Sequence, residues 1–101
     1  MKIIEKLSEM IEEEIEDAAK YAKCALHYKE EDPSLAEMFY KLSTEEMVHM
    51  NVLHTKIVGI IEDYRKKNGE PPESMLKLYE ILHKKHIENA AAVKGMQSLY
   101  K

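Results

Sequence analysis

Residues 35–57 read LAEMFYKLSTEEMVHMNVLHTKI, and this stretch decides how the chain folds. Side chains three and four positions apart lie on one face of an α-helix. Mostly apolar residues recur at this spacing: Leu35, Met38, Phe39, Leu42, Glu46, His49, Met50, Leu53 and Ile57. The pattern predicts a long amphipathic helix whose core-facing stripe is interrupted by Glu46 and His49. A charged side chain on such a stripe must be paired or bound to a metal ion.

Glu46-Met47-Val48-His49 is a Glu-x-x-His motif, which bundles that bind two metal ions direct toward their centre. The tetrapeptide alone is weakly specific because the chain is rich in Glu. Glu80-Ile81-Leu82-His83 is a second copy. Position along the chain must distinguish the two.

Composition favours a single all-α domain over residues 1–101. Of the 101 residues, 34% are charged and only three are Gly and three Pro. The net charge of -4 gives no basis for binding nucleic acid, which needs a basic surface. The single cysteine excludes an intrachain disulfide or a multi-cysteine metal site within one chain, and it favours a reducing compartment.

The N-terminal residues MKIIEKLSEMIEEE are interrupted by charges where a signal peptide needs an apolar run. The chain also has no run approaching the roughly 18 apolar residues of a membrane span. We therefore expect a cytoplasmic protein that does not bind a membrane.

Helical periodicity extends over most of the chain and predicts three helices, at about residues 3–30, 33–68 and 72–100. Asp32 is a suitable N-cap and Pro33 a suitable first helical residue. Asn68-Gly69, followed by two prolines, is a strong stop signal. Because the first connection is short, the first two helices should be antiparallel neighbours.

The first and third helices also carry apolar stripes. Their predicted core positions are Ile4, Leu7, Met10, Ile11, Ile15, Ala18, Ala22 and Ala25 in the first, and Met75, Leu78, Tyr79, Leu82, His86, Ala90, Val93 and Met96 in the third. Five methionines are expected to fill core space, namely Met10, Met38, Met47, Met50 and Met75. Cys24 is expected to be a small buried or half-buried side chain.

Glu14 differs from the other acidic residues of the first helix. Its neighbours at helical spacing are mostly apolar, so its side chain points into the apolar stripe. Glu14 also lies about as far before the predicted turn as Glu46 and His49 lie after it. The antiparallel hairpin should therefore bring Glu14, Glu46 and His49 to the same level.

The second Glu-x-x-His copy does not share that level. If the third helix folds straight back along the second, Glu46 and His49 meet it near residues 90–92, roughly 15 Å from Glu80. Glu80 and His83 are therefore predicted to form a partly exposed pair at i,i+3 spacing. The other histidines are predicted to be structural, His86 as a hydrogen-bonded core residue and His54 and His27 as surface or packing residues.

Glu14-x6-Tyr21-x3-Ala25 followed by Phe39-x2-Leu42-x3-Glu46-x2-His49 resembles the first helical hairpin of the rubrerythrin branch of the ferritin-like superfamily. The resemblance covers about residues 5–60. It implies that Glu14 is a terminal carboxylate ligand, Glu46 a bridging ligand and His49 the imidazole ligand of a catalytic di-iron site. It also implies that Tyr21 is the family's tyrosine near that site.

The chain departs from the family pattern in having one motif-bearing hairpin and no Cys-rich rubredoxin module. It therefore encodes half of a site, which small two-helix relatives such as the encapsulated ferritins complete by dimerising. The resemblance thus implies a ferritin-like four-helix bundle completed by a homodimer or a higher even assembly. A twofold axis would bring four Glu and two His together around two iron ions per dimer, with manganese as the other metal these ligands suit.

The implied function is ferroxidase-like iron oxidation or iron handling. The alternative is a metal-free helical interaction module in which the polar residues only fix the register of a dimer. An encapsulin shell is a further candidate partner. Residues 95–101 are only a weak indication of such cargo, because they continue the apolar pattern of the third helix.

Overall fold

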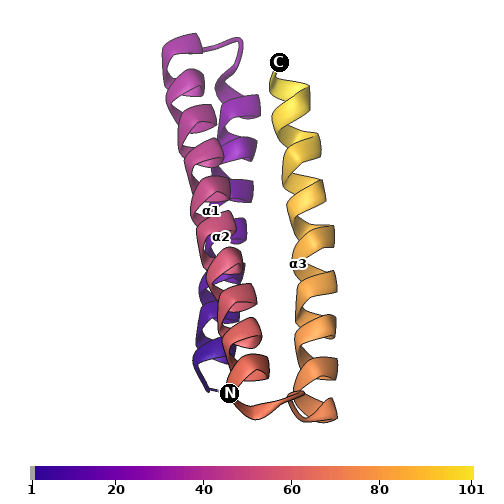
Figure 1. Cartoon of the computed structure of the whole chain (residues 1–101). Helices are drawn as coiled ribbons and strands as arrows, with labels where there is room; N and C mark the ends of the chain where they lie inside the picture. The colour runs from indigo at the N-terminus through magenta and orange to yellow at the C-terminus, as the bar shows by residue number, and fades with distance from the viewer. Residues whose placement is uncertain (1) are drawn as a thin grey trace.

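The computed structural model describes residues 2–101 and folds them into three α-helices. These are α1 (Lys2–Tyr28), α2 (Pro33–Asn68) and α3 (Glu73–Tyr100). No strand occurs in this described range, and the helices form a rod of 56 × 19 × 18 Å (Figure 1). The prediction of an all-α fold with three helices is confirmed, and the predicted ends are within two residues of those observed. None of the helices in residues 2–101 is long and apolar enough to cross a membrane.

Local signals in the sequence set the two connections. The backbone N–H of Leu35 donates to Asp32 Oδ1 at 3.2 Å, so Asp32 caps α2, and Pro33 begins the helix. Gly69 adopts a φ of 79°, which favours glycine, and its N–H donates to the carbonyl of Arg65 at 3.0 Å. The helices therefore run up, down and up, with α1 and α2 antiparallel (Figure 1).

The third helix packs mainly against α1 and makes much less contact with α2. This differs from the expectation that it would lie straight back along α2. The reason is that Ile11 and Ile15 of α1 occupy the centre of the hydrophobic core and meet Val93 and Ala90 of α3 as well as the core residues of α2. In Figure 1, α3 accordingly stands apart from α2 along much of its length.

The core side of α2 is rotated from the predicted stripe. Its buried residues are Ala36, Ser43, Met47, Ile57 and Ile61, and of these only Ile57 lies on the predicted stripe. Met38 is 45% exposed and His49 is also exposed, while the other predicted positions are half-buried. α2 carries two adjacent apolar stripes, and the one with small Ala36 and Ser43 allows α1 to approach closely.

The predicted core of α1 is largely confirmed. Six of its eight expected residues are buried, Leu7 is half-buried, and Met10 is 40% exposed. In α3, His86, Ala90 and Val93 are buried as expected, but Leu78 is exposed. The expectation that all five methionines fill the core is therefore wrong for Met10 and Met38. It holds for Met47, and Met50, Met75 and Cys24 are half-buried.

One buried hydroxyl joins all three helices. Ser43 Oγ donates to the carbonyl of Ala18 in α1 at 2.7 Å and accepts from Gln97 Nε2 of α3 at 2.8 Å. Ser43 is fully buried, so water cannot replace these partners. The contact fixes the level of α3 relative to the α1–α2 hairpin.

Ser43→Ala is expected to lower the free energy of unfolding by about 1–2 kcal/mol, because the variant leaves the Gln97 amide and the Ala18 carbonyl without their partner. Thr44→Ala is the matched control, since Thr44 Oγ1 only bonds the Lys41 carbonyl one turn earlier in the same helix. Urea denaturation followed by circular dichroism measures both. Equal losses for the two variants would contradict the role assigned to Ser43.

Candidate metal centre

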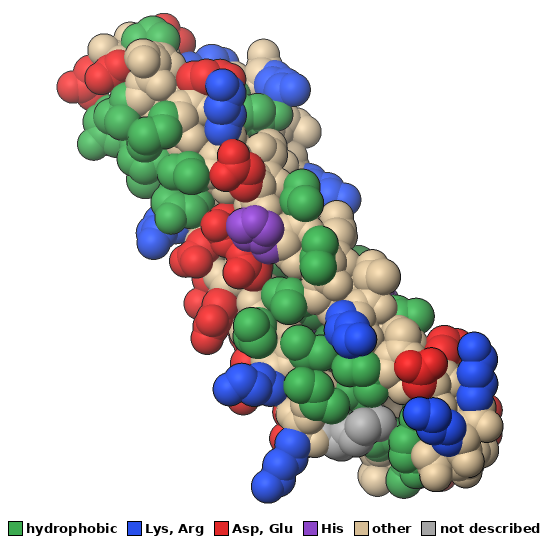
Figure 2. Space-filling view, turned by 60° about the vertical axis from the view of Figure 1, so that its left-hand side comes forward, with side chains coloured by type: hydrophobic (Ala, Val, Ile, Leu, Met, Phe, Trp, Pro, Cys, Tyr) green, Lys and Arg blue, Asp and Glu red, His purple; other side chains and the backbone are tan. Residues whose placement is uncertain are grey.

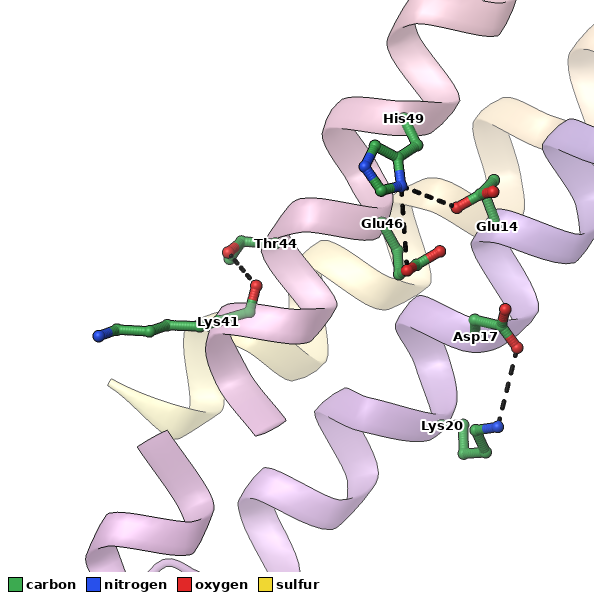
Figure 3. A network of polar contacts seen from close by, with 7 residues as sticks. All are labelled: Glu14, Asp17, Lys20, Lys41, Thr44, Glu46 and His49. Atoms are coloured by element: carbon green, nitrogen blue, oxygen red, sulfur yellow. Dashed lines mark hydrogen bonds and ion pairs between the residues drawn. The ribbon is translucent and has the colours of Figure 1, made fainter. Parts of the chain in front are cut away.

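The structure brings together Glu14 of α1 and Glu46 and His49 of α2 (Figure 3). His49 Nδ1 lies 3.3 Å from Glu14 Oε2 and 3.9 Å from Glu46 Oε1. One ligand-type atom from each of the three residues lies within 4.8 Å of the others. These side chains come together because the two antiparallel helices rise equally from a tight turn. The distances of Glu14, Glu46 and His49 from that turn in the sequence predicted this arrangement.

The cluster lies on the face of the hairpin opposite α3. Glu12 and Ile15 of α1 border α3, whereas Glu14 projects to the other side of the helix, and α3 lies behind the hairpin in Figure 3. The side chains of Glu46, Glu14 and His49 are 18%, 26% and 58% exposed. Within one chain the predicted stripe through Glu46 and His49 therefore does not face the core, because α3 covers the other face of the hairpin.

Apolar side chains border the cluster on both sides along the rod. Figure 2 shows a histidine among acidic side chains, with hydrophobic patches above and below it. Ile3 and Met10 lie on the Glu14 face of α1 and Met38 lies near the His49 face of α2, and the three are 46%, 40% and 45% exposed. A polar centre flanked by exposed apolar side chains is typical of a face that another helical surface covers.

The two carboxylates interact strongly. A hydrogen bond with Glu14, partial burial and the charge of Glu14 together raise the pKa of Glu46 from 4.5 to about 7, although His49 opposes this shift. Asp17, one turn beyond Glu14 on the same face, raises the pKa further. The position where a proton joins the two carboxylates is one that a cation could occupy instead.

The donor set is chemically suited to particular metals. Carboxylate oxygens and an imidazole nitrogen suit Fe(II) and Mn(II), whereas thiolate ligands would favour softer ions. The single cysteine, Cys24, is not part of the cluster. Glu14, Glu46 and His49 would supply three protein ligands per chain and leave the remaining coordination positions open.

The chain was compared with protein-family models, with curated proteins and with solved structures. None of the three comparisons found a match. The ferritin-like resemblance therefore rests on the motif spacing of residues 14–49 and remains a prediction.

The other residues singled out in the sequence make contacts of their own. Tyr21 packs on Phe39, with ring centroids 6.3 Å apart. His83 stacks between His54 and Tyr79, and among residues 2–101 no hydrogen bond or ion pair joins it to Glu80. The predicted exposed Glu80–His83 pair is therefore wrong. Within the described range no second group of three His, Cys, Asp or Glu side chains brings its ligand atoms within 4.8 Å of one another.

Two features were missed by sequence reasoning. The effect of Asp17 on Glu46 is the first: the i,i+3 spacing places Asp17 on the face of Glu14, but the sequence analysis gave it no role. The stacking of His54 on His83 had no such signal, because it depends on the relative level of α2 and α3.

Proposed function

We propose that this protein is a di-iron or di-manganese carboxylate protein that oxidises or handles iron, with its metal site shared between two chains. The observation that carries the proposal is the meeting of Glu14, Glu46 and His49, whose ligand atoms lie within 4.8 Å of one another. The raised pKa of Glu46 supports it, because paired carboxylates are stabilised by a proton or a cation.

The proposed site is shared because one chain supplies three ligands on a half-open face. A twofold axis passing over this face would bring together four Glu and two His, the ligand set of a carboxylate-bridged bundle. The same dimer would cover exposed apolar side chains such as Met10 and Met38. Two α1–α2 hairpins would then form a ferritin-like four-helix bundle, with α3 on its outside.

In this proposal Fe(II) is the substrate. Two Fe(II) ions give up one electron each, and dioxygen takes up both electrons and two protons to form hydrogen peroxide. Peroxide as oxidant would take the two electrons and two protons to form two water molecules. The carboxylates of Glu14 and Glu46 offset the charge of the cations, and a proton held by Glu46 leaves to solvent when a cation binds.

Anaerobic titration with Fe(II), followed by exposure to oxygen, tests the proposed function. We expect binding at about one ion per chain, as in a site shared by two chains. Oxygen should then produce the near-ultraviolet absorbance of Fe(III). A protein that binds no Fe(II) or Mn(II) would contradict the proposal.

One observation favours a metal-free helical interaction module as the second candidate. His49 already contacts Glu14 and Glu46 at 3.3 and 3.9 Å, so the three side chains could satisfy one another and only fix the register of a dimer. The iron content of the purified protein distinguishes this module from the metal protein.

A homodimer or a higher even assembly is expected at micromolar concentration. Met38→Glu, on the proposed interface, should shift the population toward monomer because it places a charge in a covered apolar face. Ile81→Glu is the matched control, since Ile81 is 67% exposed on α3, outside this face. Analytical ultracentrifugation measures both. A wild-type protein that remains monomeric with metal present would contradict the shared site.

A further inference from the structure

A cavity of about 310 Å³ lies between α2 and α3, and none of the candidate metal ligands lines it. Three histidines line it, His54 from α2 and His83 and His86 from α3. Apolar side chains such as Ile11 and Met50 complete much of its wall. These three histidines, the histidine cluster, take no part in the proposed metal chemistry.

Aromatic rings bridge the two helices at this cavity. The rings of His54 and His83 lie face to face, with centroids 4.6 Å apart and an interplanar angle of 10°. The ring of Tyr79 is also parallel to that of His83, with centroids 5.5 Å apart. α2 and α3 make few other contacts, chiefly the Ser43–Gln97 hydrogen bond and the stacked rings of Tyr40 and Tyr100, so the histidine stack is one of the main connections between them.

The surroundings of the cluster provide little compensation for positive charge. The facing charged or titratable groups are Glu12 on α1 and Tyr79, Lys85 and Lys94 on α3, while α2 adds the neutral Met50 and Asn51. Glu12 is the only carboxylate among them, and its Oε1 already accepts from Lys85 Nζ at 3.0 Å. A protonated imidazole here would therefore lie among other positive groups.

We propose that the histidine cluster is a proton-sensitive contact, in which the stacked and buried rings hold α3 beside α2 and protonation of His54 and His86 releases it. Two charged rings 4.6 Å apart would repel each other, and the buried His86 would have to move toward water. Parallel rings direct their nitrogen lone pairs side by side and not toward one point. This geometry favours a proton over a metal ion as the ligand of the cluster.

The expected pH range follows from the protonation of the folded state. Burial is the main cause that lowers the pKa of both His54 and His86 below the ordinary value of 6.5, and the neighbouring histidines lower them further. When α3 is released, the rings of His54 and His86 are exposed to water, and this state binds protons more readily than the state in which the rings are packed. The contact is therefore fully present above about pH 6.5 and weakens as the pH falls below it.

Hydrogen exchange of the full chain at pH 7.5 and 5.5, corrected for the intrinsic exchange rate, tests the proposal. We expect α3 amides to lose severalfold more protection than α1 and α2 amides, because protonation of the rings releases α3 and leaves the α1–α2 hairpin in place. His54→Phe/His83→Phe keeps the ring stack but removes the imidazole of His54, one of the two whose pKa burial lowers, so it should reduce this difference. His27→Phe, at the exposed end of α1, should retain it.

A pH response of α3 that is equal in wild type and in the His54→Phe/His83→Phe variant would overturn the proposal. A direct measurement on the unaltered protein does not depend on whether that variant folds. Side-chain NMR titration should show His54 and His86 protonating below pH 6.5, together with loss of contacts between α2 and α3. Titration of both residues at or above 6.5 would also overturn it.

Discussion

Glu46→Ala is expected to weaken Fe(II) or Mn(II) binding by at least about a hundredfold, which corresponds to about 2.8 kcal/mol. Glu46 is the most buried of the three clustered side chains, and in a shared site it would bridge two cations. Its loss would remove a ligand from both metal ions and leave Glu14 without its partner. Anaerobic isothermal titration calorimetry measures the affinity.

Glu45→Ala and Glu16→Ala are the matched controls for this prediction. Both residues are exposed glutamates on the same two helices, and neither belongs to the cluster. We expect each to retain its affinity within about twofold, because exposed charges contribute weakly. Equal losses in all three variants would show that nonspecific negative charge, and not the cluster, attracts the cation.

The helix ends and the level of the cluster could be predicted because they depend on local chemistry and chain length. Asp32, Pro33 and Gly69 set the connections through a cap, a fixed φ and a positive φ. Two antiparallel helices rise equally from a short turn, so Glu14 had to meet Glu46 and His49. Neither the helix ends nor the shared level of the three residues depends on which side chains are buried in the core.

The burial of α2 could not be predicted from periodicity alone. The helix carries one stripe through Ala36, Met47 and Ile57 and a neighbouring stripe through Leu42 and Leu53. Which stripe is buried depends on where α3 packs. Because α3 joined α1, the cluster was left on a half-open face.

The same dependence explains why the cavity histidines were missed. His54 and His83 come from helices whose lateral offset is set by their packing on α1 and by the Ser43–Gln97 hydrogen bond. Sequence spacing within one helix contains no information about that offset. Long-range packing thus decides where the histidine cluster and the apolar face of the hairpin lie.

The Glu14→Gln/Glu46→Gln variant is expected to melt higher than metal-free wild type at pH 8. The folded-state pKa of Glu46 is about 7, above its ordinary value of 4.5. The stabilisation from its bound proton is therefore fully present below about pH 4.5 and is lost as the pH rises through 7. Neutral amides avoid repulsion between the carboxylates, so we expect a gain of about 1 kcal/mol, or about 4–8 °C.

Metal should stabilise wild type but not the double variant. Wild type should gain about 2.7 kcal/mol when Mn(II) is present at a hundred times its dissociation constant, because the ion binds only the folded state. The double variant lacks both carboxylate ligands and should show no shift. Thermal melts followed by circular dichroism, with chelator or with Mn(II) and at pH 5 and pH 8, measure these effects. Glu16→Gln/Glu45→Gln also removes two carboxylates but lies outside the cluster, so it is the control for a loss of negative charge.

The pH 5 melts separate repulsion from a general effect of substitution. At pH 5 Glu46 of wild type keeps its proton, so the advantage of the double variant should largely disappear. If the double variant melts lower than metal-free wild type at pH 8 and wild type is indifferent to Mn(II), Glu14 and Glu46 are structural partners of His49. The contacts of 3.3 and 3.9 Å would then have a structural role, and the protein would be a metal-free helical interaction module.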